Sequence, residues 1–413
     1  MGAAVAIVER QQRGTAVFWR YWTASTISNV GDAVTTVALP LVAVQALRAT
    51  TFEVSLITAA GYVAWLLIGL PAGVLVARLP LRGTQVAMDL VRGAALASVP
   101  VAGLFGVLRL PQLVAVALVV GLASVVFFVG NSTLLPAIVP ADQLTARNSL
   151  TSGTQAVTQL SGPSLGGVLV QAVGGVGSLL VDVASYVVSA VLLAGMPRPR
   201  DGRAIPRRDP PLAMIAAGLR YVARHRVMRS CVAAATLTNF VCGALLALTP
   251  VYLVRTLGAP PGLVGLLMAT EGVGSLVGAA LTPRLARRIG SARALVAAGL
   301  IGAALALLMP LAGDGWGLLV FAAGNAGFAG GVVVLSVLTR THRQTTTPPD
   351  LLSRVMATVR FVSWGAIPLG ALAAGAAATL LGNRGALALT CVLAFAVPAV
   401  LLTGPVRRLR DLA

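Results

Sequence analysis

The sequence contains no lysine, so all 31 of its basic residues are arginine. Acidic residues are also scarce, because only 12 residues are Asp or Glu and charged residues make up 10% of the chain. A soluble domain carries roughly a quarter charged residues. With 57% hydrophobic residues and a mean hydropathy of +0.90, the composition argues against such a domain and indicates a membrane protein.

Cysteine and histidine are scarce as well, which excludes several kinds of site. Cys231, Cys242 and Cys391 form no CxxC pair, so neither a disulfide framework nor a zinc site is supported. His225 and His342 both fall in predicted cytoplasmic loops, and no intramembrane metal set or Ser/His/Asp set can be assembled. The sequence therefore argues against an enzyme and predicts no metal and no cofactor.

Long apolar runs recur from one end of the chain to the other. A membrane-spanning helix needs about 20 predominantly apolar residues. Twelve segments meet this requirement: 18–47, 53–77, 85–108, 112–139, 148–173, 175–196, 230–256, 261–283, 293–312, 316–340, 354–381 and 384–404. The predicted fold is therefore an all-α membrane protein with twelve transmembrane helices.

The arginines are distributed unevenly between the two sides of this predicted helix array. If the N-terminus is cytoplasmic, 27 of them lie in cytoplasmic loops and helix ends, whereas Arg48, Arg109, Arg255 and Arg384 lie on the other side. Positive residues are enriched on the cytoplasmic side of membrane proteins. The pattern predicts that both termini are cytoplasmic, and it explains the net charge of +19 without a nucleic-acid partner.

The chain divides into two similar halves at a charge-dense segment, residues 197–211. A shift of 210 residues aligns three landmarks of the halves: Asn29 with Asn239, Pro40 with Pro250 and Arg78 with Arg288. Parallel repeats of six spans are common among secondary transporters. We expect two pseudo-symmetric six-helix bundles, over residues 1–196 and 230–413, joined by a cytoplasmic linker over residues 197–229.

The linker contains a segment with helical periodicity. Leu212, Leu219 and Val222 share one face of a helix, and Arg220 and Arg224 fall on another. The pattern predicts an amphipathic helix that lies on the cytoplasmic membrane surface. An ordinary solvated linker is the alternative.

The segment GVLVARLPLRG, residues 73–83, carries a recognisable pattern. It resembles the loop signature of the major facilitator superfamily, Gly-x-Leu-x-Asp-Arg-x-Gly-Arg-Arg/Lys, with matches at Gly73, Leu75, Arg78 and Arg82. Ala77 stands at the Asp position. The resemblance implies a loop that latches a cytoplasmic gate by charge pairing, so a negative charge is missing.

Asp89 and Arg92 lie about one turn apart at the start of the next span. We expect Asp89 to supply the missing negative charge to Arg78 or Arg82, so that all four residues take part in gating. Simple anchoring of the arginines at the membrane interface is the alternative.

The segment SGPSLGG, residues 161–167, resembles the Gly-Pro-x-x-Gly-Gly signature of proton-coupled exporters in the same superfamily. Pro163 removes a helix hydrogen bond and bends the span. Gly162, Gly166 and Gly167 allow a neighbouring helix to approach closely. We expect a tight, bent gating contact that seals one side of a pathway.

Other segments, among them VPADQLTARNSL and LSRVMATVRFVSWGAIPLG, resemble the twelve-helix drug:proton antiporters that include macrolide-efflux and enterobactin-export proteins. The resemblance covers nearly the whole chain. It implies a fold and a transport class but no substrate.

Two carboxyl groups are predicted deep inside the membrane. Ser25, Asn29, Asp32 and Thr36 follow a 4-3-4 spacing and share one face of the first span. Asp32 lies roughly 18 Å along this helix from Arg20, near the midplane of a ~30 Å hydrocarbon core. Glu271 lies roughly 15 Å into its own span by the same rise.

Neither acid is matched in the other half, because a shift of 210 residues places Asp32 opposite Cys242 and Glu271 opposite Gly61. An ionised carboxylate at such a depth costs several kcal/mol. A carboxyl group withdrawn from water exchanges protons more readily near neutral pH. We therefore predict that Asp32 and Glu271 couple transport to protons. A neutral carboxyl that only holds helices together is the alternative.

Several other polar residues fall inside predicted spans. The residues predicted to line a substrate cavity are Ser25, Asn29, Thr36, Asn131, Gln155, Gln159, Asn239 and Asn325. Packing of helices through polar side chains is an equally good interpretation of each. Asp182 is expected to be structural, and the sequence leaves open whether Arg360 reaches the cytoplasm or pairs with a buried acid.

Together these features predict a monomeric, multi-pass protein of the inner membrane that works by alternating access. The expected function is proton-driven export of a small organic or amphipathic molecule. Uptake of a metabolite, uniport, and a non-transporting membrane receptor remain the alternatives.

Overall fold

The computed structural model describes the backbone of residues 2–69, 71–140, 143–197 and 211–412. The first part of the chain forms α1 (Gly2–Gln45), α2 (Thr51–Ile68), α3 (Pro71–Arg78), α4 (Leu81–Leu104), α5 (Leu110–Ile138) and α6 (Leu144–Ala194). The second part forms α7 (Pro211–Arg224), α8 (Arg226–Val251), the π-helix η1 (Tyr252–Thr256), α9 (Pro261–Ile289), α10 (Ser291–Ala306), α11 (Leu308–Leu311), η2 (Gly315–Gly317), α12 (Leu318–Thr346), α13 (Pro349–Trp364), α14 (Ala366–Leu393), α15 (Ala396–Thr403) and η3 (Pro405–Arg408). No β-strand occurs among these residues, so the prediction of an all-α protein is confirmed.

Ten segments of the described chain are long and apolar enough to cross a membrane, compared with the twelve predicted. Two of the ten segments contain a kink at a glycine, Gly174 in α6 (φ 78°) and Gly382 in α14 (φ 69°). Glycine adopts positive φ at little cost. Both glycines lie at or beside the predicted boundaries between neighbouring spans, so each long segment consists of two helices joined at a kink.

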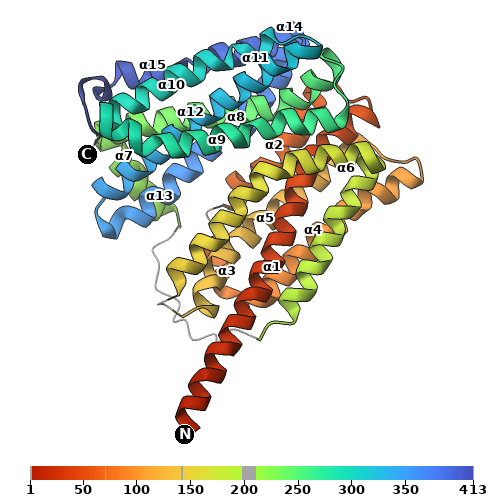
Figure 1. Cartoon of the computed structure of the whole chain (residues 1–413), viewed down its shortest axis with the longest axis vertical. Coiled ribbons are helices and arrows are strands. Elements are labelled where there is room, and N and C mark those ends of the chain that lie inside the picture. The colour runs from red at the N-terminus through yellow and green to blue at the C-terminus, as the bar shows by residue number, and fades with distance from the viewer. Residues whose placement is uncertain (1, 70, 141–142, 198–210, 413) are drawn as a thin grey trace.

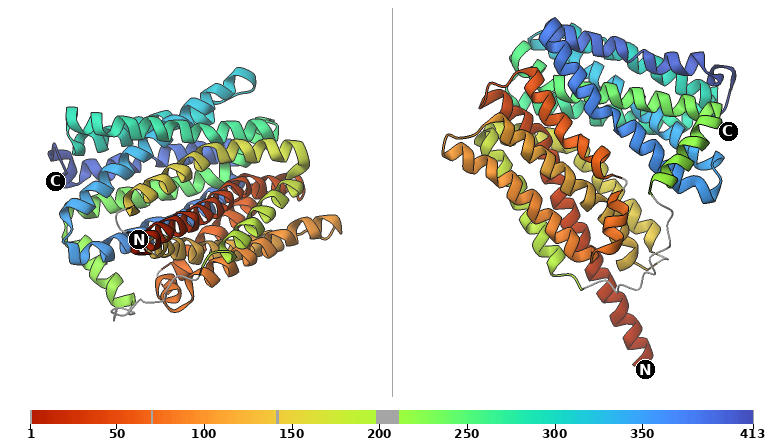
Figure 2. Two further views of the ribbon diagram at one scale, coloured as in Figure 1. Left: turned by 60° about the horizontal axis from the view of Figure 1, so that its bottom comes forward. Right: turned by 180° about the vertical axis from the view of Figure 1, so that it is seen from behind.

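The helices gather into two bundles. Figure 1 shows α1 to α6, coloured red to lime, in one group and α8 to α15, coloured green to blue, in the other. Figure 2 shows the same separation from two further directions. The bundles contact each other mainly through α6 against α9 and through α2 against α14.

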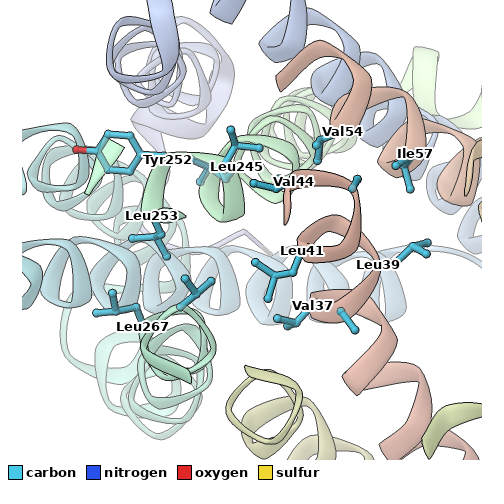
Figure 3. Packing of buried hydrophobic residues seen from close by; sticks show 14 of the residues in the cluster. Val37, Leu39, Leu41, Val44, Val54, Ile57, Leu245, Tyr252, Leu253 and Leu267 are labelled. Carbon is cyan, nitrogen blue, oxygen red and sulfur yellow. The ribbon is translucent and has the colours of Figure 1, made fainter. Parts of the chain in front are cut away.

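A cluster of buried apolar residues joins the bundles. In Figure 3, Val37 and Leu41 of α1 and Ile57 of α2 belong to the same cluster as Leu253 and Leu267 of the second bundle. Val37 and Leu41 lie in the second half of α1, and Ile57 lies near the start of α2. The shared core therefore lies far along α1 from the N-terminus.

Two glycine contacts between the bundles repeat with the period of the sequence. A Cβ atom on Gly167 of α6 would lie 2.7 Å from the Cα of Gly265 in α9, and one on Gly375 of α14 would meet Ser55 of α2. Gly265 and Ser55 are separated by 210 residues, the shift that aligns the two halves, and Gly167 and Gly375 are separated by 208. The same close approach thus occurs twice, as a duplicated bundle requires.

The segment predicted as an amphipathic helix forms α7, which packs against α13. Val222 packs with Val355 and Val359 of α13, and Gly218 lies against Thr358. Leu219, which was assigned to the apolar face, is exposed. The absence of a side chain on Gly218 lets α13 approach α7 closely there. Leu212 and residues 198–210 lie outside the described side chains.

Candidate functional site

Three helices of the first bundle carry polar residues at helical spacing. Ser28, Asp32 and Thr35 lie along α1, Gln85, Asp89 and Arg92 along α4, and Asp182, Ser185, Tyr186 and Ser189 along α6. Residues three, four and seven apart share one face of a helix. Because α6 packs against both α1 and α4, the three polar faces meet inside the bundle.

Arg92 is the centre of this cluster. Its side chain is 1% exposed, and it forms ion pairs with Asp32 at 3.4 Å and with Asp89. It also donates a hydrogen bond to Ser28 Oγ at 3.3 Å. The guanidinium carbon lies 4.2 Å from the ring centroid of Phe127 and 4.4 Å from that of Tyr186. One guanidinium therefore holds α1, α4, α5 and α6 together.

Asp32 lies at the edge of the cluster, because 37% of its side chain is exposed. The Tyr186 hydroxyl donates a 2.5 Å hydrogen bond to its Oδ1 atom, and Arg92 approaches both oxygens. Thr36, one turn further along α1, is exposed. Asp32 therefore contacts a buried ionic network on one side and accessible space on the other.

The expected pairing of Asp89 with Arg78 or Arg82 is wrong. Asp89 is fully buried, pairs with Arg92 and accepts a 2.6 Å hydrogen bond from Ser189. Arg82 instead donates to the carbonyl oxygen of Met196 at 2.5 Å, and Arg78 is exposed. Asp89 is seven residues from Arg82, roughly 10 Å along the helix, but only one turn from Arg92.

Asp182 is a third carboxyl group of the same region. It is fully buried in α6 and accepts hydrogen bonds from the hydroxyls of Thr35 in α1 and Ser185, the latter at 2.9 Å. A Cβ atom on Gly31 of α1 would collide with Asp182 and Ser185. The glycine therefore makes room for this carboxyl between α1 and α6.

Glu271 lies on the inner side of the second bundle. Successive residues of a helix are rotated by about 100°. The exposed apolar residues Leu266, Val273 and Val277 of α9 therefore lie on roughly the opposite face from Glu271. Glu271 is exposed, and it interacts electrostatically with Tyr62 of α2 and Cys242 of α8. The carboxyl group therefore faces space between the bundles, where both halves can reach it.

Arg360 of α13 is half-buried and forms no ion pair with any acidic residue whose side chain the structure describes. Its guanidinium carbon lies 4.1 Å from the ring centroid of Trp364, 4.5 Å from that of Phe128 and 4.6 Å from that of Trp65. Trp65 and Phe128 belong to α2 and α5 of the first bundle. The three rings form a cage around one cation across the bundle interface.

The residues of the SGPSLGG segment form two packed contacts. Gly162 and Gly166 lie against Ala33 and Val34 of α1, and Gly167 lies against the backbone of α9. The carbonyl oxygen of Pro163 faces Gly265 in the same contact. A side chain at either of the facing glycines would push α6 and α9 apart, so this segment forms a close contact between the bundles.

The remaining predicted cavity residues have diverse surroundings. Ser25 is buried, whereas Asn29, Asn131, Gln155 and Asn239 are partly exposed. Asn325 is buried and donates to Thr270 Oγ1 at 3.1 Å and to the Leu267 carbonyl oxygen, so it joins α12 to α9. Gln159 lies outside the described side chains.

Sequence reasoning missed Tyr186, Ser189 and the aromatic residues around Arg360. The first two had a signal, since positions 182, 186 and 189 follow the same helical spacing that singled out Asp32. The aromatic cage had none, because its rings come from helices far apart in the sequence.

Comparison with known proteins identifies the family and the fold of the chain. Residues 13–412 match the model of a family described as transmembrane secretion effector. The chain is 26% identical over 395 residues to the multidrug efflux pump Tap of Mycolicibacterium fortuitum, covering 92% of each protein. It is 29% identical over 297 residues to an uncharacterized transporter of the major facilitator type, y4rN of Sinorhizobium fredii, covering 71% of this chain and 72% of that protein.

Among solved structures, the nucleoside transporter NupG in its D323A form superposes with a TM-score of 0.78. The alignment covers 94% of this chain and 99% of that one at 9% sequence identity, which shows a shared fold. This family and fold are those of membrane transporters rather than enzymes. The chain therefore belongs to the transmembrane secretion effector family of the major facilitator superfamily and is a multi-pass transporter of the cell membrane.

Proposed function

We propose that this transporter exports a small organic or amphipathic molecule in exchange for protons, and that Asp32 is the group through which the proton passes. The observation that carries the proposal is the position of Asp32 between an open space and a buried ionic network. A carboxyl group in that position can contact substrate or water on one side. On the other side its charge interacts with Arg92 and Tyr186, which belong to α4 and α6.

The charge balance of the network supports proton binding. Asp32 and Asp89 pair with one buried cation, Arg92, and no described basic residue forms an ion pair with the neighbouring Asp182. One guanidinium balances one carboxylate, and each further buried negative charge without a partner costs several kcal/mol. Protons are the simplest means of neutralising the excess. Asp32 is the most accessible of the three carboxyl groups, so it is the one that can exchange its proton readily.

We further propose twelve membrane crossings with both termini in the cytoplasm. The kinks at Gly174 and Gly382 support two crossings in each of the long segments. The arginine distribution supports the orientation. The paired glycine contacts support division into bundles over residues 1–196 and 230–413, with the linker over 197–229.

In this topology the contact between Gly167 and Gly265 lies toward the extracellular ends of α6 and α9 and closes that side of the pathway. Binding of a proton at Asp32 changes the charge beside Arg92, and α1, α4 and α6 meet at that residue. Two of these helices, α1 and α6, also take part in the packing around the extracellular contact, because Gly166 of α6 packs on α1 and Gly167 of α6 packs on α9. Protonation is thereby linked to the seal between the bundles. Glu271 is the second site proposed for proton exchange.

Inverted membrane vesicles provide the test. The vesicles are loaded with a pH-sensitive dye, a proton gradient is imposed, and candidate compounds are screened for substrate-dependent proton flux. We expect Asp32→Asn to abolish this flux while the protein remains folded, and Asp314→Asn, which alters an exposed loop acid, to leave it unchanged. Flux that persists in Asp32→Asn would refute the role of this residue. Accumulation in the opposite direction would indicate uptake.

A further inference from the structure

The aromatic cage around Arg360 holds its cation without a carboxylate. Within the part of the chain that the structure describes, no acidic residue forms an ion pair with Arg360. Its Nε atom is buried and has no hydrogen-bond partner. The faces of Trp65, Phe128 and Trp364 are thus the main attraction for this charge. Rings in such a position attract any cation that fits between them.

The rings hold one another in place. Trp65 and Trp364 meet edge to face at a centroid distance of 4.8 Å, and Trp65 and Phe128 at 5.6 Å. Edge-to-face packing is a favoured geometry for aromatic pairs. The cage therefore does not depend on Arg360 alone for its shape.

One ring of the cage lies one helical turn from Tyr62 of α2. Tyr62 precedes Trp65 by three residues on α2, so both residues lie on nearly the same face. Tyr62 interacts electrostatically with Glu271. One face of α2 therefore connects an aromatic cation site with a carboxyl group in the space between the bundles, which is the pair of features that an amphipathic organic cation requires.

We propose that the cage formed by Trp65, Phe128 and Trp364 binds the charged group of an organic cation, and that Arg360 is an internal occupant that this cation displaces. The long Arg360 side chain can withdraw along α13 toward water when it leaves the rings. Because the rings come from both bundles, the cation is held only while the bundles are close together. This inference rests on the proposed transport function and specifies its substrate class.

Equilibrium dialysis of radiolabelled tetraphenylphosphonium with the purified, full-length protein tests the proposal without a gradient or turnover. Arg360→Gln removes the competing cation, so we expect binding to tighten, by about 2- to 30-fold for a competitor held by cation–π contacts. Arg360→Lys keeps a cation in place and should leave binding within about twofold of the unaltered protein. Adding Trp65→Ala to Arg360→Gln removes one ring of the cage, so binding should weaken at least about tenfold relative to Arg360→Gln alone.

Two matched variants serve as controls. Arg288→Gln removes an exposed positive charge from the end of α9, and Trp316→Ala removes an exposed tryptophan from η2. Neither change should alter binding. Unchanged or weaker binding in Arg360→Gln, or no binding of the probe to any variant, overturns the cage proposal. The probe could bind the variants with the expected relative affinities and yet not be transported by a proton gradient. That result would refute the proposed export function and would support the cage as a cation-binding site.

Discussion

Replacement of Arg92 by methionine should destabilise the first bundle severely. The side chain is almost fully buried and contacts two carboxyl groups, Asp32 and Asp89. Methionine fills similar space but leaves both carboxylates without their cation. Breaking a buried ion pair by removing one partner typically costs about 3–5 kcal/mol. For a folding unit of 150–250 residues, this corresponds to a fall of roughly 6–20 °C in melting temperature.

Thermal melting of the detergent-solubilised protein, followed by circular dichroism at pH 7, measures this effect. Arg109→Met is the matched control because Arg109 is exposed at the start of α5. Adding Asp89→Asn to Arg92→Met removes one of the stranded charges, so we expect at least half of the lost stability to return. A loss below about 1 kcal/mol in Arg92→Met, with no rescue in the double variant, would refute the ionic network as the link between α1, α4 and α6.

The same variant should respond to pH with a defined sign. In Arg92→Met the stranded carboxyl groups are disfavoured as anions in the folded state, so the folded protein binds more protons than the unfolded one. Its stability should therefore rise as the pH falls, and its deficit relative to the unaltered protein should shrink between pH 7 and pH 5. A deficit that grows over this range contradicts the charge balance.

Three further predictions address other contacts. Gly167→Leu should abolish transport while the protein still inserts into the membrane, because the new side chain would meet the backbone of α9. The control Gly153→Ala, where a Cβ atom meets nothing within 4 Å, should transport at the rate of the unaltered protein, and equal transport by both variants would exclude a gating contact at Gly167. Tyr186→Phe removes the hydrogen bond to Asp32 and should lower stability by about 0.5–3 kcal/mol and move the pH profile of transport; an unchanged profile would separate this tyrosine from the proton site. Thr50→Ala should cost about 1 kcal/mol in a thermal melt by removing a capping box, and no change would mean that this helix end does not limit stability.

The helices could be predicted from the sequence because their signal is local. Apolar runs located most of the ten long apolar segments to within several residues, although the run predicted over 53–77 divides into α2 and α3. The breaks at Gly174 and Gly382 fall at or beside expected boundaries. Spacing grouped Asp32 with Ser25, Asn29 and Thr36, whereas the buried network contains Ser28, Asp32 and Thr35 of α1, so only Asp32 is common to both sets. Long apolar helices obey one dominant constraint, the absence of water for their backbone groups, so few alternatives compete.

The partners of the polar residues could not be predicted in this way. Asp89 was assigned to loop arginines through resemblance to a signature, whereas the structure pairs it with Arg92 on the same helix. Which of several polar faces meet depends on how α1, α4 and α6 rotate against one another, and no local spacing specifies that rotation. Arg360 illustrates the same limit, since two of its three rings belong to the other bundle.

Transport by Asp32→Asn in proteoliposomes tests proton coupling most directly when two modes are compared. Proton-driven accumulation requires the carboxyl group to bind and release a proton, whereas exchange of labelled for unlabelled substrate requires only that the loaded carrier reorient. Coupling through Asp32 predicts that accumulation is lost while exchange persists. Accumulation that continues at the rate of the unaltered protein would contradict it.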